Sequence, residues 1–410
     1  MNLVGRGPDG TGDPDHARTG RRVITVVGVG ADGWDGLVPA SRRAVEAADV
    51  VVGSARQLAL VPETGAERVP LPSPLLPNLP GLLDSLPDRA VCVLASGDPM
   101  FHGIGSTLVR LVGAERVRVL PHVSSVSLAC ARLGWPVESV EVVSLVGRPS
   151  AALRAALQPG RRVLVLGGTA GVVGDTLDEA GYGPSRVVVL SDLGAPTEAV
   201  GVESGLQVIA VDCVAAPGSR PFARVPGLPD DAFEHDGQLT KREVRAVSLS
   251  RLAPFPGELL WDVGAGAGSI AIEWMRAHPS CRAVAVESRP ERAARVRRNA
   301  DALGVPALRV VEGGAPAALD GLPRPDAVFV GGGVTVPGLV EACWTALAPG
   351  GRLVANAVTL ESEAVVAGWY GRLGGDLVRL AVQRASPVGG FTGWRAAMPV
   401  TVWSVRKDTP

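Results

Sequence analysis

Short apolar, β-branched runs alternate with helical patterns along two long stretches of the chain. In the first stretch, from Arg21 to about Ala210, six runs have the length and composition of buried strands. These runs are Val23 to Val27, Val50 to Gly53, Val91 to Ala95, Val117 to Leu120, Val163 to Gly167 and Val187 to Leu190. Strands that alternate with helices are typical of α/β proteins, so we predict an α/β domain or two small α/β lobes in this half.

A segment rich in Pro and Gly, residues 215–229, interrupts this alternation, and strand patterns then restart at 259–263, 282–287, 325–330 and 400–403. A chain of 410 residues has a natural length for two domains. We therefore predict a first domain at 21–214, a linker at 215–229 and a second domain at 230–410. Residues 1–20 are rich in Gly, Asp, Arg and Thr and have no apolar run, so we predict a disordered tail and not a signal peptide.

An Asp-x-Gly-x-Gly-x-Gly turn, Asp262 to Gly268, joins the strand at 259–263 to a helical pattern. Glycines allow positive φ angles and close approach to a ligand, and the start of a helix offers unpaired N–H groups. A dinucleotide fingerprint would need its third glycine at the position of Ser269. The extra glycine is instead at position 268. The carboxylate of Asp262 at the strand end suits a cationic amino-acid moiety better than a diphosphate. Both features favour S-adenosylmethionine over NAD.

Two later strands support this interpretation. Glu287 ends the strand at 282–287, where its carboxylate can accept hydrogen bonds from both ribose hydroxyls of a nucleoside. The strand after Asp326 ends in Gly331, Gly332 and Gly333. The alternative is a glycine turn that serves packing alone.

The first half carries its own motifs at strand ends. Gly28-x-Gly30-x-x-Gly33 matches the dinucleotide fingerprint, but Asp49 precedes the second strand instead of ending it, which disfavours NAD. Ser96-Gly97-Asp98-Pro99 builds an exposed turn after a buried strand. Ser124 and Ser125 begin a helix, either as caps or as ligand contacts, and residues alone favour capping.

Composition narrows the function classes. The formal net charge is −1 and aromatic residues are 4% of the chain, so we expect no nucleic-acid partner. No apolar run is long enough to cross a bilayer, so we expect no membrane association. The five cysteines are scattered in apolar patterns, as in reduced cytoplasmic proteins, and the five histidines have no chelating spacing, so we predict no metal site.

The motifs of the first half, together with Ala129 to Trp135, resemble the tetrapyrrole methylase fold of the cobalamin pathway, in its C5-methylating subfamily. The second half, from Asp236 through Gly268, resembles the partner that methylates C15 and decarboxylates, a class I methyltransferase with a Rossmann-like fold. The fused pair resembles the precorrin-6Y C5,15-methyltransferase family over nearly the whole chain except the tail.

This resemblance implies two S-adenosylmethionine sites per chain. In the first domain it places cofactor contacts at Gly97, Asp98, Phe101, Ser124 and Ser125. In the second domain it places them at Thr240, Gly264, Ala265, Gly266, Ala267, Gly268, Glu287, Gly314 and Ala315. Two positions depart from the family: Ala31 stands where relatives often carry proline, and Gly314 where an aspartate would reach the adenine, so a contact at Gly314 must come from the backbone.

The resemblance also implies the reaction, in which precorrin-6B is methylated at C5 and C15 and loses CO2 from its C12 acetate to give precorrin-8X. Related C-terminal domains form oligomers, so we expect a homo-oligomer. The substrate carries many carboxylates, which Lys241, Arg245 and Arg395 could bind by motif position. Arg245 could equally be a solvated helix residue, and Phe391 and Trp394 could stack on the macrocycle or belong to the core. The catalytic residues stay unknown.

Two rival functions remain open from the sequence. One is a methyltransferase that acts on another substrate, such as RNA or a small metabolite. The other is a binding or regulatory protein in which only one half is catalytic, and the departures at Ala31 and Gly314 keep it open.

Overall fold

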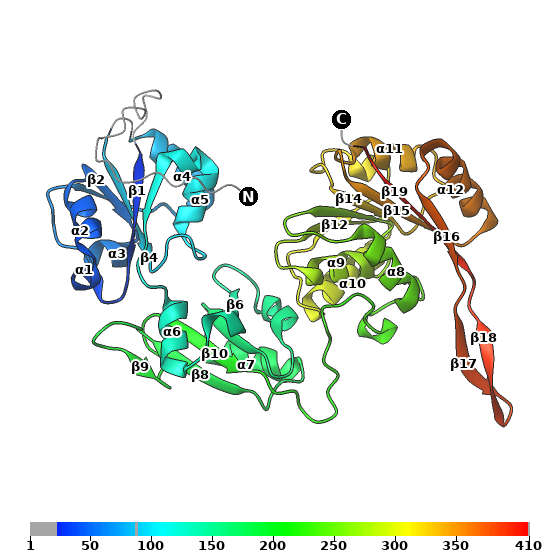
Figure 1. The fold of residues 1–410 in the computed structure, drawn as a ribbon, viewed down its shortest axis with the longest axis horizontal. Helices are drawn as coiled ribbons and strands as arrows, with labels where there is room; N and C mark the ends of the chain where they lie inside the picture. Colours follow the sequence, from blue (N-terminus) through cyan, green and yellow to red (C-terminus); the bar gives the residue numbers. More distant parts are fainter. Residues whose placement is uncertain (1–22, 87–88, 409–410) are drawn as a thin grey trace, which may run out of the picture. The chain divides into compact units, whose positions relative to one another are not determined.

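A computed structural model describes residues 23–86 and 89–408 of the chain (Figure 1). The predicted tail at 1–20 lies outside these residues. By its internal contacts the chain divides into two compact units, one formed by residues up to Ser144 with Val188–Ala210, the other by Leu145–Val187 with Val211 onward. This division differs from the predicted boundary at 214, because residues 145–187 group with the C-terminal residues. The domain boundaries at 214 and 230 therefore stay a prediction from the sequence.

The first unit contains a five-stranded sheet with the strand order β3-β2-β4-β1-β5. Its elements are β1 (Ile24–Val29), α1 (Gly33–Gly36), α2 (Pro39–Glu46), β2 (Val50–Gly53), α3 (Ala55–Ala59), β3 (Glu67–Pro70), α4 (Leu75–Asp84), β4 (Val91–Ser96), α5 (Ile104–Val112) and β5 (Val117–Leu120). The paired strands are parallel, so their carboxyl ends meet at one edge.

Successive residues of these strands point to opposite faces and build a core on each. On one face Val26 and Val93 pack with Leu79 of α4 and Leu108 of α5. On the other face the core includes Val45 of α2. Helices therefore cover both faces of this parallel sheet.

A second five-stranded sheet has the order β6-β7-β10-β8-β9. Its elements are α6 (Ser125–Leu133), β6 (Val140–Ser144), β7 (Arg162–Leu166), α7 (Ala170–Glu179), β8 (Arg186–Ser191), β9 (Ala199–Val200) and β10 (Gln207–Asp212). The two sheets confirm the predicted α/β class with two lobes in the N-terminal half, and the six predicted strands all exist. Strands β3, β6, β9 and β10 were not predicted from the sequence pattern.

The C-terminal residues form a seven-stranded sheet with the order β13-β12-β11-β14-β15-β19-β16. Its strands are β11 (Leu259–Val263), β12 (Arg282–Glu287), β13 (Arg309–Glu312), β14 (Ala327–Val330), β15 (Arg352–Ala357), β16 (Asp376–Leu380) and β19 (Val400–Arg406). Strands β11 to β15 pair in parallel, and β19 runs antiparallel between β15 and β16. A separate hairpin joins β17 (Gln383–Val388) to β18 (Phe391–Ala396).

Helices cover both faces of this sheet, and each face has its own apolar core. The helices are α8 (Arg242–Leu252), α9 (Ser269–Ala277), α10 (Pro290–Ala302), α11 (Leu339–Ala346) and α12 (Leu360–Leu373). Leu260 and Phe329 face α8, α9 and α10, whereas Trp261 and Val328 face α11 and α12. The strand order reverses at β11, which confirms the predicted Rossmann-like fold and marks the edge where ligands bind in such sheets.

The end of the predicted linker is packed and not free. The N–H groups of Gly227 and Leu228 donate to the Glu273 carboxylate of α9 at 2.6 and 3.0 Å, and the Leu228 side chain is buried. No helix among the described residues has the length and apolar character needed to cross a membrane. All five cysteines are buried and free, as the sequence predicts.

Candidate functional sites

A cavity of about 710 Å³ opens at the carboxyl ends of β11, β12, β14 and β15 in the C-terminal sheet. Most of the residues predicted to contact the cofactor in this half line it. These are Thr240, Gly264, Ala265, Gly266, Glu287, Gly314 and Ala315. The cavity thus lies where the strand order reverses, which is the expected place for a ligand.

The three glycines of the turn are required for different reasons. Gly264, Gly266 and Gly268 have φ angles of +72°, +59° and +77°. A Cβ atom at Gly264 would lie 2.9 Å from the Gly332 backbone, and one at Gly266 would lie 2.9 Å from the Gln238 carbonyl oxygen. A Cβ atom at Gly268 would instead meet Val296 of α10 at 2.7 Å. The first two glycines therefore let the turn approach the Gly332 and Gln238 backbones closely, whereas Gly268 lets α9 pack against α10.

Glu287 ties the end of β12 to this turn. Its carboxylate accepts hydrogen bonds from the N–H of Gly266 at 2.8 Å and from the N–H of Arg289 at 3.0 Å. The residue is only 4% exposed but lines the cavity, so its remaining acceptor positions face the space where a ligand would lie.

Asp262 lies beneath the turn. Its carboxylate accepts the N–H of Ala271 at 3.0 Å, and the residue is 1% exposed. Burial, together with the charge of nearby Glu287, raises the pKa of Asp262 to about 7. Asp262 does not line the cavity, so the structure gives it the role of holding the start of α9 instead of the expected contact with a cationic moiety.

Ala267 and Gly268 also lie behind the cavity wall. Ala267 is buried, and its carbonyl oxygen accepts a hydrogen bond of 2.9 Å from Asn299. These two residues shape the turn from behind instead of lining the cavity.

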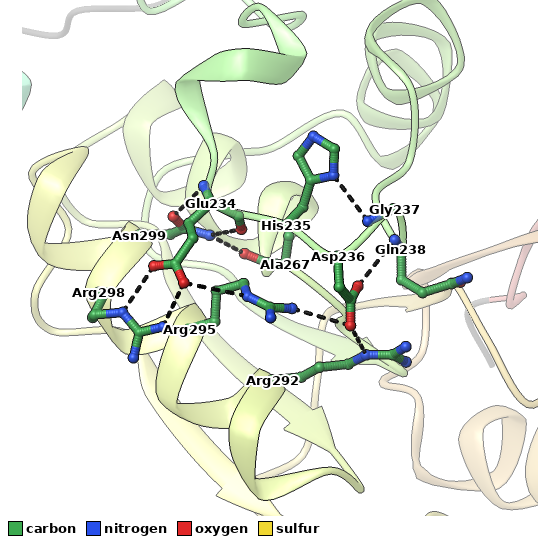
Figure 2. Close-up of polar contacts among 10 residues, drawn as sticks. All are labelled: Glu234, His235, Asp236, Gly237, Gln238, Ala267, Arg292, Arg295, Arg298 and Asn299. Carbon is green, nitrogen blue, oxygen red and sulfur yellow. Dashed lines mark hydrogen bonds and ion pairs between the residues drawn. The ribbon is translucent and has the colours of Figure 1, made fainter.

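The segment before α8 forms another wall of the cavity, and Figure 2 shows how its start is held. Asp236 accepts hydrogen bonds from Arg292 at 2.8 Å and from the N–H of Gln238 at 3.1 Å. The Arg292 guanidinium and these neighbours hold the pKa of the Asp236 carboxyl well below its usual value. Glu234 pairs with Arg298 at 2.6 Å two residues earlier.

The three residues predicted to bind substrate carboxylates have different environments. Lys241 lines the cavity and is half exposed. Arg245 is fully buried, paired with Glu273 at 2.6 Å and with Asp230 at 3.3 Å, and it donates to the Thr240 carbonyl at 2.5 Å. Because these partners enclose the Arg245 guanidinium away from the cavity, Arg245 is neither a substrate contact nor a solvated residue, and it holds the cavity wall.

Arg395 lies on β18 and does not line the cavity. Phe391 and Trp394 on the same hairpin are 85% and 75% exposed, so neither belongs to the core. Gln238, Arg292 and Asn356 also line the cavity, although the sequence did not predict them as site residues. For Asn356 a signal existed, because it is a polar residue near the carboxyl end of the buried strand β15.

In the first unit the predicted motifs meet at the carboxyl ends of β1, β4 and β5. A Cβ atom at Gly28 would lie 2.0 Å from the Gly97 carbonyl oxygen and 2.6 Å from the His122 nitrogen. Gly97 has a φ of +57°, and its carbonyl accepts the His122 N–H at 3.3 Å. The three loops therefore touch through their backbones, which only glycine at 28 permits.

Three of the side chains predicted to contact cofactor here, those of Asp98, Phe101 and Ser124, have partners nearby in the chain. Asp98 accepts the N–H of Met100 at 2.9 Å and so shapes its own turn. Ser124 caps α6 by accepting the Ser127 N–H at 3.1 Å, as residues alone had favoured, and Ser125 is the first helical residue. Phe101 is 41% exposed and meets His102 edge to face.

Within residues 23–86 and 89–408, no three His, Cys, Asp or Glu side chains gather as a metal ion would require.

Residues 23–206 match the family of Tetrapyrrole (Corrin/Porphyrin) Methylases, and residues 231–407 match the Precorrin methyltransferase domain.

Two relatives match almost the full chain. A precorrin-6Y C(5,15)-methyltransferase [decarboxylating] from Sinorhizobium sp is 48% identical, covering 94% of this chain and 96% of the relative. The protein of that name from Mycobacterium tuberculosis (strain CDC 1551 / Oshkosh) is 49% identical, covering 94% and 100%. A crystal structure of the C-terminal domain of the Rhodobacter capsulatus precorrin-6Y C5,15-methyltransferase is 47% identical, covers 45% of this chain and 100% of its own, and has a TM-score of 0.43. Because the two full-length relatives are 48% and 49% identical over 94% of this chain, the chain belongs to the precorrin-6Y C(5,15)-methyltransferase [decarboxylating] family.

Proposed function

We propose that the chain is an S-adenosylmethionine-dependent enzyme that methylates precorrin-6B at C5 and C15 and removes CO2 from its C12 acetate, giving precorrin-8X. The identity of about 48% over 94% of the chain supports the substrate and reaction. The main support for the cofactor is the glycine turn in the cavity where the strand order reverses. There the Gly266 N–H donates a hydrogen bond of 2.8 Å to the carboxylate of Glu287.

The cavity residues fit this cofactor. Glu287 offers buried acceptors to ribose hydroxyls, and the absent Cβ atoms at Gly264 and Gly266 let the turn lie against the Gly332 and Gln238 backbones that also line the cavity. The backbone of the turn at Gly264 to Gly266 and the polar wall at Thr240 lie around the same space. Gly314 lines the cavity with only backbone atoms to offer, so an adenine contact there is a backbone contact.

The chemistry needs positioning more than a strong base. When bound, the cofactor supplies an electrophilic methyl group on a sulfonium. The cavity walls hold the nucleophilic carbon in line with that methyl and exclude water, which accounts for much of the rate in such displacements. Lys241 and Asn356, both on the cavity wall, are the groups we assign to orienting the substrate acetate.

We further propose a second cofactor site in the N-terminal half, at Gly97, Asp98, Phe101, Ser124 and Ser125, with C5 methylation at 21–214 and C15 methylation and decarboxylation at 230–410. The contact of Gly28, Gly97 and His122 at one sheet edge supports it.

The free buried cysteines support a cytoplasmic enzyme. The exposed Phe391 and Trp394 on the hairpin support a homo-oligomer, which light scattering of the purified chain will test.

Mass spectrometry of the product from precorrin-6B and S-adenosylmethionine tests the reaction. Gain of two methyl groups with loss of CO2 is the expected result. A product with one methyl group and no CO2 loss would place all activity in the N-terminal half. Calorimetry tests the two-site proposal, which one cofactor per chain would contradict.

A further inference from the structure

Residues 237–241, here called the strap, form the cavity wall that passes over the glycine turn of the C-terminal sheet. The Gln238 carbonyl oxygen would lie 2.9 Å from a Cβ atom at Gly266, so strap and turn are in direct backbone contact. The strap therefore forms the wall of the cavity beside a ligand seated on the turn.

One end of the strap is fixed in the protein interior. The Thr240 carbonyl accepts a hydrogen bond from Arg245, whose side chain has no solvent exposure. Arg245 is in turn paired with the buried Glu273 at 2.6 Å. Breaking a buried pair of this kind leaves an uncompensated charge, so this end stays fixed in the folded protein.

The other end is held by ion pairs, which Figure 2 shows. Asp236 contacts Arg292 at 2.8 Å and Arg295 at 3.2 Å, both on α10. Its side chain is 32% exposed, and those of Arg292 and Arg295 are 18% and 15% exposed. Ion pairs with this access to water are weaker and are screened by salt.

A change of backbone direction separates the strap from Glu234. Gly237 has a φ of +97°, a conformation that favours glycine, and its N–H donates to His235 Nδ1 at 3.1 Å. Before it, the backbone of Glu234 is fixed independently, because Asn299 donates to its carbonyl at 3.0 Å and accepts its N–H at 2.8 Å. The ion pairs of Asp236 therefore tie the exposed end of the strap to α10.

We propose that Asp236 is a positioning residue that holds the strap closed over the cofactor in the C-terminal cavity and so sets the rate at which the cofactor leaves. This inference rests on the proposed function of that cavity. Asp236 does not line the cavity itself, and it acts through Arg292, Arg295 and the strap backbone.

Release of radiolabelled S-adenosylmethionine from the full-length chain tests the proposal. Because Gly266→Val should lose the C-terminal cofactor site, the release phase that is absent in this variant is assigned to the C-terminal cavity. In Asp236→Asn, which keeps an acceptor for the Gln238 N–H but loses the charge, we expect this phase to become about tenfold faster with an unchanged melting temperature. High salt will accelerate the phase in the wild type and leave Asp236→Asn unaffected.

Glu234→Gln is the matched control, because it removes a similar ion pair with α10 from a residue whose backbone Asn299 already fixes. We expect its release rate to match the wild type. An unchanged rate in Asp236→Asn, or an equal acceleration in Glu234→Gln, would overturn the proposal. If Gly266→Val still shows every release phase, the assignment of the cavity as the cofactor site fails instead.

Discussion

The N–H of Gly266 donates a hydrogen bond of 2.8 Å to the carboxylate of Glu287, so the glycine turn after β11 and the end of β12 form one structural unit. Parallel pairing of β11 with β12 brings these ends together, and Val263 lies opposite Val286 in the register. The shape of the turn and the placement of the ribose acceptor therefore depend on each other.

Glu287→Ala will weaken the C-terminal cofactor site. The change removes the proposed ribose acceptor and leaves the N–H groups of Gly266 and Arg289 without their partner. We expect cofactor affinity to fall by about 10- to 100-fold, measured by calorimetry. Glu312→Ala is the control, because Glu312 ends the neighbouring strand but pairs with Arg297 at 2.8 Å and does not line the cavity. Equal losses in both variants would contradict the role of Glu287.

Gly266→Val will abolish C15 methylation and decarboxylation while C5 methylation persists. A Cβ atom at this position would lie 2.9 Å from the Gln238 carbonyl, and the φ of +59° disfavours a β-branched residue. Gly368→Val, at an exposed helix position with open space around it, should retain both activities. Product mass spectrometry separates the outcomes, and full C15 activity in Gly266→Val would refute the site.

The glycine turn and Glu287 could be predicted because the chemistry is local, with strand, turn and acid at fixed spacing. Arg245 could not, because its role depends on Glu273, which is 28 positions away in the sequence and lies beside it only after α8 packs on α9. Arg395 was placed near the site by motif position, yet it lies on a hairpin outside the cavity wall. Sequence patterns predicted about half of the described strands, and they missed both the two-residue β9 and six-residue strands such as β10 and β15.

Arg245→Met will destabilise the fold. The change leaves the buried Glu273 carboxylate without its charged partner and frees the Thr240 and Leu228 carbonyls. We expect the free energy of unfolding to fall by about 3–5 kcal/mol in urea titrations. Arg242→Met, on the exposed side of the same helix, should change it by less than about 0.5 kcal/mol. A small effect at Arg245 would mean that its buried pair is dispensable.

Asp262→Asn will change how stability depends on pH. The folded-state pKa of Asp262 is raised to about 7 by burial, so between its ordinary value and pH 7 the folded protein binds more protons than the unfolded chain. The contribution of Asp262 to the free energy of unfolding therefore falls as pH rises through that window. Relative to wild type, the variant should gain up to about 4 kcal/mol between pH 4 and pH 8, measured by urea unfolding at each pH. A constant difference across the window would show that Asp262 does not titrate there.

Gly28→Ala will abolish C5 methylation and leave C15 methylation and decarboxylation intact. A Cβ atom at Gly28 would overlap the Gly97 carbonyl at 2.0 Å and the His122 nitrogen at 2.6 Å, so the loops of the proposed N-terminal cofactor site must separate. Gly81→Ala is the control, because Gly81 lies within α4 with no atom near its Cβ direction. The expected product from precorrin-6B carries one new methyl group and has lost CO2, because the C-terminal cavity has its own fold and core. Loss of both methylations in a variant that still melts like the wild type would show that the two halves do not act independently.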